Sequence, residues 1–251
     1  MQFLVLASGK GQRLKKYTKK KPKCLVKILK YRIIDYLKIN FKYFKEVIIV
    51  AGYKSRLIKN EFIKQKIIIN KIYYKSNMVH SLFCSKKLIN GDVIISYSDI
   101  IFSPEIIRKM IKINKTHIPI NESWLKIWLK RMNKKNILKD AETLKINSNY
   151  VISLGKKLVK KLPKFQFMGL VRVNFKDFKK LSIFYKSLND KKIDMTNFLD
   201  LAIKKKVIKL NYFKTKKFWF EIDSTNDLKI LKKSDNLMKE LNRILKNTGI
   251  A

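Results

Sequence analysis

The chain has 251 residues, of which 46% are hydrophobic and 12% are aromatic. This composition excludes a disordered basic tail and leaves enough apolar side chains for one large folded domain or two small ones. The 59 Lys and Arg residues against 18 Asp and Glu give a net charge of +41, which attracts polyanions such as nucleotides, nucleic acids or anionic membranes. Because the lysines are spread along the whole chain, compositional drift is the simpler explanation of this charge.

Two features indicate where the protein works. No apolar run of the sequence approaches the length of a membrane span. The two cysteines, Cys24 and Cys84, form neither a CxxC motif nor a metal-ligand spacing, and two thiols in a chain of this length favour a reducing compartment. We therefore expect a cytoplasmic protein that does not insert into a membrane.

The first hundred residues alternate between short apolar runs and helical patterns. Their periodicity predicts strands at 3–8, 46–52, 66–74 and 92–99. It predicts helices between them at 33–41, 54–63 and 78–89. Strands this apolar suit a parallel sheet that is covered on both faces, and strand–helix–strand alternation implies right-handed crossovers.

The pattern changes after a helix predicted at 103–111. Shorter strands, antiparallel or mixed, are predicted at 116–120, 123–132, 142–146, 149–155 and 165–173. Two helices and two strands then follow, at 175–188, 195–203, 207–213 and 217–223, and a basic amphipathic helix begins near residue 235. We expect an α/β fold, a Rossmann-like three-layer α/β/α sandwich with a mixed, mainly parallel sheet, formed by a main domain at 1–232 and a basic helical tail at 233–251.

A glycine-containing stretch, "LASGKGQRL", follows the first predicted strand, where open parallel sheets bind ligands. Gly9 and Gly11 allow a tight turn that points backbone N–H groups at an anion. Arg13 offers a fork for phosphate oxygens, and Lys10 and Lys23 add point charges. The stretch matches neither a Walker A motif nor a dinucleotide fingerprint, so taken alone it fits a simple tight turn equally well.

Three acidic residues lie where predicted strands end. Asp99 follows "ISYS", and Glu221 and Asp223 are two positions apart, which places them on one face of a strand. Carboxylates on one face repel each other unless a cation lies between them, so these residues are candidate metal ligands. The alternative is structural: Asp99 is a helix cap or a turn residue, and Asp223 or Ser224 caps the following helix.

Trp124, Trp128 and Arg131 are spaced by four and three positions, so on a helix all three would share a face. On a strand the two tryptophans would still share one face. Most such aromatic residues belong to a core, and the functional alternative is the wall of a ligand pocket, where an indole face holds a cation. His80 and His117 are predicted to be packed or surface residues rather than ligands.

Taken together, these stretches resemble a known family. "LVLASGKGQRL…KPKCLVKI" resembles the LAAGxGxRL…PKxL signature of nucleotidyltransferases, with Ser8 where alanine is usual. "VAGY" at 50–53, "NMVHSL" at 77–82, "SYSD" at 96–99 and "WFEIDSTNDL" at 219–228 follow in that family's order, so that the resemblance covers 1–232. It implies a nucleotidyltransferase catalytic domain of the nucleotide-diphospho-sugar transferase type.

A second set of stretches, "DAETLKI…VISLGKK…FQFMGLVRV…DMTNFL", is similar to the branch that contains phosphocholine, phosphonate and phosphoglutamine cytidylyltransferases. The resemblance implies transfer of CMP from CTP to a phosphorylated or phosphonate small molecule, with Mg²⁺ as cofactor. The CDP- or CMP-activated product would serve the decoration of surface polysaccharide such as capsule. A monomer or a homodimer is expected, without a specific nucleic-acid partner, and the acceptor itself is left open.

The resemblance also implies roles for individual residues. Arg13 and Lys23 would be catalytic, and Asp99, Glu221 and Asp223 would hold the metal. The nucleotide would be bound by Leu6, Ala7, Ser8, Gly9, Lys10, Gly11, Tyr53, Asn77, Ser81 and Ser98. The acceptor would be bound by Asp140, Glu142, Gln166 and Met168, to which the aromatic pattern adds Trp124.

Two alternative functions remain from the sequence. A sugar-1-phosphate nucleotidyltransferase that uses UTP or another NTP would share the same loop and the same metal-binding acids. A nucleic-acid-binding protein would explain the net charge and the tyrosines set among lysines, as in "KYFK" and "IYYKS". The order of the motifs favours the enzyme, because drift toward lysine does not place acids at strand ends beside a glycine loop.

Overall fold

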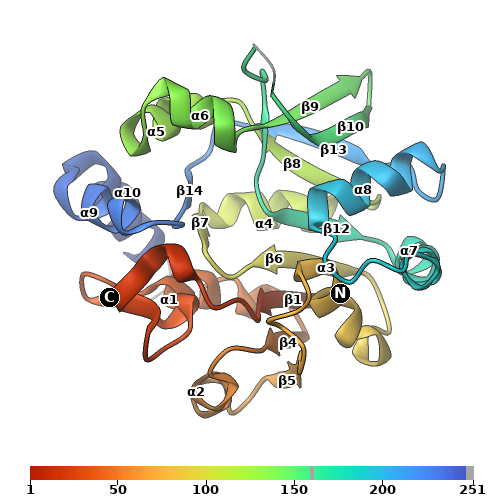
Figure 1. Cartoon of the computed structure of the whole chain (residues 1–251), viewed down its shortest axis with the longest axis horizontal. Coiled ribbons are helices and arrows are strands. Elements are labelled where there is room, and N and C mark those ends of the chain that lie inside the picture. Colours follow the sequence, from red (N-terminus) through yellow and green to blue (C-terminus); the bar gives the residue numbers. More distant parts are fainter. Residues whose placement is uncertain (159–160, 247–251) are drawn as a thin grey trace.

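The computed structural model describes residues 1–158 and 161–246 (Figure 1). In this part of the chain, a ten-stranded mixed sheet has the order β5-β4-β1-β6-β12-β8-β13-β10-β9, and β11 pairs with β8. The first four strands in this order are parallel: β5 (Lys66–Ile69), β4 (Glu46–Ala51), β1 (Gln2–Ala7) and β6 (Val93–Tyr97). All six residues of β1 are buried, because this strand lies inside the sheet with helices over both faces.

The direction of the sheet changes at β12 (Leu170–Val173), which is antiparallel to both β6 and β8 (His117–Asn121). The remaining strands are β13 (Asn211–Thr215), β10 (Tyr150–Lys157), β9 (Glu142–Asn147) and β11 (Gln166–Phe167). β13 is parallel to β8, whereas β10 is antiparallel to both β13 and β9. The sheet is therefore mixed, with its parallel half at the amino-terminal end of the chain.

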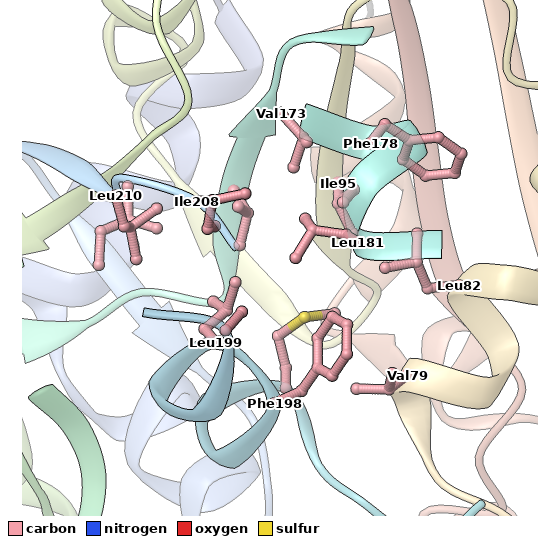
Figure 2. Close-up of a cluster of buried hydrophobic side chains, with 14 of the residues drawn as sticks. Val79, Leu82, Ile95, Val173, Phe178, Leu181, Phe198, Leu199, Ile208 and Leu210 are labelled. Atoms are coloured by element: carbon pink, nitrogen blue, oxygen red, sulfur yellow. The ribbon is translucent and has the colours of Figure 1, made fainter. Parts of the chain in front are cut away.

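Helices cover both faces of the sheet. One face packs against α3 (Met78–Cys84), α7 (Phe175–Ser187) and α8 (Met195–Lys204). Figure 2 shows this cluster, in which side chains of these three helices meet Ile95 and Val173 of the sheet. The other face packs against α1 (Ile33–Lys38), α2 (Ser55–Glu61), α4 (Pro104–Lys112), α5 (Trp124–Arg131) and α6 (Lys134–Asp140). The predicted three-layer α/β/α architecture is confirmed.

A third apolar cluster lies beside the sheet, between α1 and the carboxyl-terminal helices α9 (Thr225–Lys233) and α10 (Asp235–Lys246). It also includes a hairpin, β2 (Lys27–Ile28) with β3 (Tyr31–Arg32), and a ribbon, β7 (Ile100–Phe102) with β14 (Trp219–Glu221). The apolar face of α10 is buried in this cluster. Residues 247–251 of the predicted tail lie outside the described residues, and the domain boundary near 232 stays a prediction.

One predicted element is wrong in type. Residues 123–132, taken as a short strand, form the helix α5. Trp124, Trp128 and Arg131 fall on one helical face, and all three are buried. Burial of that face decides the local structure, since the aromatic composition alone suits a strand as well. Two strands also end earlier than predicted, β5 at Ile69 and β6 at Tyr97.

The stretch predicted as one strand at 165–173 forms two, β11 and β12. Gly169 lies between them with a φ of 72°, a conformation that side-chain-bearing residues rarely adopt. Within the described residues, helices long and apolar enough to cross a membrane are absent.

Candidate active site

The glycine stretch forms a loop at the carboxyl end of β1, on the rim of a cavity of about 530 Å³. Gly11 has a φ of 64°, and a Cβ at this position would lie 2.8 Å from Cβ of Lys23. Only glycine therefore fits here without displacing Lys23. The hydroxyl group of Thr18 donates to the carbonyl oxygen of Gly11 over 3.0 Å and closes the loop.

Most of the predicted nucleotide-binding residues line this cavity: Leu6, Ser8, Gly9, Lys10, Gly11, Asn77, Ser81 and Ser98. Ala7 differs, because its side chain points into the core on the opposite face of the sheet. Tyr53 lies behind the loop, where its hydroxyl group donates to the carbonyl oxygen of Lys19 over 2.7 Å and its backbone N–H donates to Ser8 over 2.9 Å. The position of Tyr53 indicates that it holds the loop in place rather than lining the cavity.

Besides Gln12 and Met78, sequence reasoning missed four residues that line the same cavity, namely Tyr73, Tyr74, Ser76 and Tyr97. Tyr97 ends β6, and the other three follow β5. All four thus lie past or at the carboxyl ends of parallel strands, which is where such sheets bind ligands. The signal for Tyr73 and Tyr74 was hidden because the third strand was predicted to run to residue 74, and that for Tyr97 because the fourth was predicted to run to residue 99.

Asp99, Glu221 and Asp223 come together at the edge of this cavity. Each offers one carboxylate oxygen, and these three oxygens lie within 4.8 Å of one another. The antiparallel pairing of β14 with β7 places Glu221 opposite Ile100, next to Asp99. The backbone N–H of Ile222 donates to the carbonyl oxygen of Asp99 over 2.9 Å and fixes this arrangement.

The donor set fits a hard divalent cation such as Mg²⁺, which binds carboxylate oxygens. Oδ1 of Asp99 is buried and has no hydrogen-bond partner among the described residues. Burial raises the pKa of the Glu221 carboxyl group well above its usual value, and the nearby charges of Asp223 and Asp99 raise it further. A cation bound between the three carboxylates would remove both penalties.

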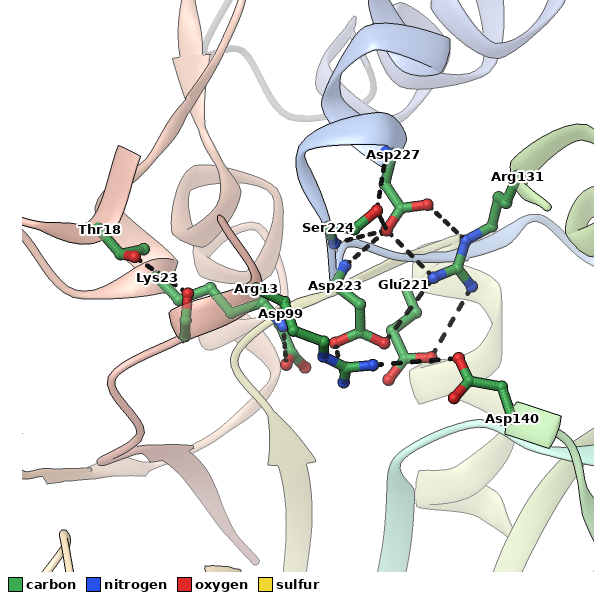
Figure 3. A network of polar contacts seen from close by, with 11 residues as sticks. Arg13, Thr18, Lys23, Asp99, Arg131, Asp140, Glu221, Asp223, Ser224 and Asp227 are labelled. Carbon is green, nitrogen blue, oxygen red and sulfur yellow. Dashed lines mark hydrogen bonds and ion pairs between the residues drawn. The ribbon is translucent and has the colours of Figure 1, made fainter. Parts of the chain in front are cut away.

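Two basic side chains reach the same carboxylates (Figure 3). Nζ of Lys23 lies 2.7 Å from Asp99 and 2.8 Å from Asp223, and a guanidinium nitrogen of Arg13 lies 2.9 Å from Asp223. Burial opposes the charge of Lys23, but the two carboxylates outweigh it and raise the pKa of this ammonium group above its usual value. Burial likewise opposes the charge of Asp223, yet Lys23 and Arg13 hold the pKa of Asp223 below its usual value. Both groups are therefore charged at neutral pH.

Arg131 of α5 supports this cluster from the protein interior (Figure 3). Its side chain is only 1% exposed, and its Nε donates to Asp227 over 2.8 Å. Asp227 in turn accepts a hydrogen bond from the backbone N–H of Asp223 over 2.9 Å. The guanidinium group also lies 3.8 Å from Glu221 and from Asp223. Arg131 thus ties α5 to the segment that carries two of the three carboxylates.

The two sequence interpretations of 221–224 both describe part of the structure. Ser224 is the N-cap residue of α9, and it forms a capping box with Asp227. Asp223 points instead into the carboxylate cluster. The structural role thus belongs to Ser224, and the carboxylates that a metal could bind are those of Glu221 and Asp223.

A second cavity, of about 250 Å³, adjoins the first and shares Arg13, Met78, Tyr97 and Asp223 with it. Four of the predicted acceptor residues line it, namely Asp140, Glu142, Gln166 and Met168. Burial raises the pKa of Glu142, and the carboxylates of Asp194 and Asp140 raise it further, although a hydrogen bond with Thr196 acts in the opposite direction. Asp194 and Trp219 also line this cavity and were missed.

Trp124 corrects the aromatic part of the prediction. Its side chain is 1% exposed and packs edge-on against Trp128, with 5.3 Å between the ring centroids. Trp128, one helical turn further on, lines the cavity instead. The two histidines are packed as predicted: His117 is buried, and His80 shares a hydrogen bond with Tyr185.

No model of a known protein family matches the chain. A CTP:phosphoglutamine cytidylyltransferase of Campylobacter jejuni is 34% identical over 256 residues, which cover 92% of this chain and 98% of that protein. Among solved structures, an inositol-1-phosphate CTP transferase of T. maritima has a TM-score of 0.77 at 19% identity, covering 100% of this chain and 97% of that one. A CTP:phosphocholine cytidylyltransferase of Streptococcus pneumoniae has a TM-score of 0.70 at 18% identity, covering 92% and 97%. The structural likenesses support the fold, and the identity to the Campylobacter protein shows that the chain belongs to the cytidylyltransferases, a family of nucleotidyltransferase enzymes.

Proposed function

We propose that the protein transfers CMP from CTP to a phosphorylated or phosphonate small molecule and releases pyrophosphate. The observation that carries this proposal is the junction of two cavities at one cluster of carboxylates and basic side chains. The larger cavity has a volume in the range of ligand pockets and begins at a glycine loop that suits a triphosphate. The smaller cavity has room for a compact acceptor beside it.

In this reaction an oxygen of the acceptor's phosphate or phosphonate group attacks the α-phosphorus of CTP. The bond from the α-phosphorus to the oxygen bridging to the β-phosphate breaks, and its electron pair leaves with pyrophosphate. The attacking oxygen is already anionic, so no side chain has to remove a proton from it. The chain's task is to bring two polyanions together and to stabilise the charge that develops between them.

The chain's own groups fit this task. Backbone N–H groups of the loop at 9–13 would hold the triphosphate, and Arg13 and Lys23 would neutralise it. Arg13 lines both cavities, so it can contact donor and acceptor phosphates at once. Asp99, Glu221 and Asp223 would hold Mg²⁺, which when bound neutralises charge on the donor phosphates.

The nature of the acceptor decides the product. A phosphate ester gives a CDP-linked product, and a phosphonate gives a CMP-linked one. In this proposal the enzyme acts in the cytoplasm as a monomer or homodimer, without a specific nucleic-acid partner. Its activated product serves the decoration of surface polysaccharide such as capsule.

The second candidate, a sugar-1-phosphate nucleotidyltransferase that uses UTP or another NTP, needs the same loop and carboxylates. A pyrophosphate-release assay separates the two when it crosses the four NTPs with phosphocholine, 2-aminoethylphosphonate, phosphoglutamine and several sugar 1-phosphates. We expect release with CTP and a phosphorylated non-sugar acceptor. Faster release with UTP and a sugar 1-phosphate would replace the proposal with the second candidate.

A further inference from the structure

The smaller cavity is acidic in a protein that is otherwise strongly basic. Five of the chain's 18 acidic residues line it: Asp140, Glu142, Asp194, Glu221 and Asp223. Among the described lining residues, Arg13 is the only basic one. Compositional drift toward lysine would not produce an acidic cavity, so the negative charge of this cavity requires a separate explanation.

The candidate metal site and the nearby basic side chains would neutralise only some of these five carboxylates. Glu221 and Asp223 belong to the metal-binding cluster, where Arg131 and Lys23 face them. Asp140 has a distant contact, 3.9 Å, with Arg13. Glu142 and Asp194 have no ion pair with a basic side chain of the described residues, and Asp194 caps α8. The end of the cavity formed by these two residues is therefore suited to a positive charge on a ligand.

Gln166 supplies a second, independent observation in the same cavity. The residue is only 7% exposed, and its Oε1 has no hydrogen-bond partner among the described residues. A buried amide oxygen without a donor costs free energy, roughly 1–3 kcal/mol, until a donor reaches it. A ligand that carries N–H groups would supply that donor.

The aromatic residues of the cavity decide which kind of cation fits. A quaternary ammonium has no N–H donor and is usually held between exposed aromatic faces. Among the described residues four aromatic side chains line the cavity: Trp128, Trp219 and Phe167 are 4%, 2% and 9% exposed, and the half-buried Tyr97 packs edge-on against Phe167. The guanidinium group of Arg131 lies over the ring of Trp128, and the indole N–H of Trp219 donates to the carbonyl oxygen of Met168. Of these four side chains only that of Tyr97 is not buried, so they do not form an aromatic cage for a quaternary ammonium, whereas carboxylate and amide oxygens are available.

We infer that the acceptor carries, in addition to its phosphate or phosphonate group, a protonated amine with N–H donors that binds to Glu142, Asp194 and Gln166. This inference rests on the proposed function, because it takes the smaller cavity as the acceptor site. The enzyme would therefore prefer amino-bearing acceptors to quaternary ammonium compounds and to neutral ones. The attacking oxygen would then lie at the Arg13 end of the cavity and the amine at the Glu142 end, so that the cavity fixes the direction of the acceptor.

The test uses acceptors that share one carbon chain and differ only at the far end. Pyrophosphate release from CTP is measured with phosphoethanolamine, phosphocholine and propyl phosphate, and with phosphoglutamine against its desamino counterpart. We expect kcat/KM to be at least about tenfold higher for the amino-bearing member of each set. Equal or faster turnover of phosphocholine, or of the desamino compound, would overturn the inference and leave the proposed function intact. No turnover with any of these acceptors would instead refute the proposed function.

Two variants connect the preference to the cavity. Glu142→Gln and Gln166→Leu should each lower kcat/KM for the best amino-bearing acceptor about tenfold or more, with KM for CTP unchanged. Turnover of the matched acceptor without an amine should change little. Glu240→Gln, which makes the same change on α10 away from both cavities, is the control and should behave as wild type. If Glu142→Gln and Gln166→Leu lower the turnover of both acceptors equally, these residues do not recognise the amine of the acceptor.

Discussion

Nζ of Lys23 lies 2.8 Å from a carboxylate oxygen of Asp223, although 200 positions separate the two residues in the sequence. The same ammonium group lies 2.7 Å from Asp99. Lys23 therefore joins the loop that follows β1 to the ends of β6 and β14 and compensates two carboxylates. In the proposed reaction it would also face the phosphates of CTP, and it would then have a structural and a catalytic role at once.

The first prediction concerns Lys23→Met, which keeps much of the side chain's volume and removes the charge. The carboxylates of Asp99 and Asp223 would then repel each other, so the free energy of unfolding should fall by roughly 1–3 kcal/mol. Turnover should fall by at least about a hundredfold, because a charge that stabilises the transition state is lost. Urea denaturation and pyrophosphate release measure the two effects.

Lys10→Met is the matched control for stability, because Lys10 lines the same cavity but is exposed. Its free energy of unfolding should equal that of wild type. A Lys23→Met protein as stable as wild type would show that the lysine does not compensate the carboxylates.

The second prediction separates a metal ligand from a turn residue at Asp99. Mg²⁺ with CTP should raise the melting temperature of wild type through binding to the folded state. In Asp99→Asn this rise should shrink strongly and most turnover should be lost, because the variant keeps the shape of the side chain and removes one charge. The exposed turn residue Asp190 provides the control Asp190→Asn, which should keep the full rise. An Asp99→Asn protein that gains as much from Mg²⁺ and CTP as wild type would exclude Asp99 from the metal site.

The third prediction concerns Arg131→Lys. A lysine keeps the charge but cannot form the paired contacts with Asp227, nor lie flat between the rings of Trp128 and Phe220, whose centroids are 5.3 and 5.5 Å from the guanidinium carbon. We expect a loss of roughly 2–4 kcal/mol in the free energy of unfolding, since the side chain is buried. The gain in melting temperature from Mg²⁺ should also fall, because Asp223 loses its support.

Arg243→Lys on the exposed side of α10 controls for the exchange itself and should change neither quantity. If Arg131→Lys lowers the stability but leaves the Mg²⁺ effect at its wild-type size, Arg131 supports the fold and not the carboxylates.

Some features of the fold and of the site can be predicted from the sequence, and others cannot. The apolar runs around β1, β4 and β6 predict buried parallel strands, because burial on both faces requires apolar side chains throughout. The position of Asp99 at a strand end likewise follows from the period of that strand. Contacts between strands that are far apart in the sequence cannot be predicted in this way. One example is the pairing of β14 with β7, which brings Glu221 beside Asp99.

Lys23 shows the same limit. Its sequence neighbourhood predicts a phosphate contact without a structural role, whereas its ion pairs with Asp99 and Asp223 depend on the tertiary structure. Trp124 and Trp128 show a second limit, because the helical spacing identifies their shared face but not which of them reaches the cavity. Only the packing of α5 on the sheet decides this.

The fourth prediction is a pH dependence caused by His117. Burial lowers the pKa of its imidazole to about 4, and the charge of Arg172 lowers it further, while the hydrogen bond to the carbonyl oxygen of Lys115 opposes the shift. Between about pH 6.5 and pH 4, the unfolded chain therefore binds a proton at this residue that the folded chain does not. The stability contributed by the neutral imidazole is complete above this window and is lost as the pH falls through it, by up to about 3 kcal/mol.

Urea denaturation of wild type and His117→Phe between pH 7 and pH 4 measures this contribution as the difference in slope. The slope of the variant should be smaller. Parallel curves for the two proteins would mean that His117 titrates alike in the folded and unfolded chain.

The central claim is that the protein joins CMP to the phosphate or phosphonate group of an acceptor. The most direct measurement is ³¹P NMR of the products formed from CTP, Mg²⁺ and the acceptor that the pyrophosphate assay identifies. The account predicts a new product that contains the CMP group in a P–O–P linkage, together with one pyrophosphate for each CTP consumed. Formation of CDP with free phosphate, or of CDP with a diphosphorylated acceptor, would place the attack on the γ-phosphorus and would contradict the account.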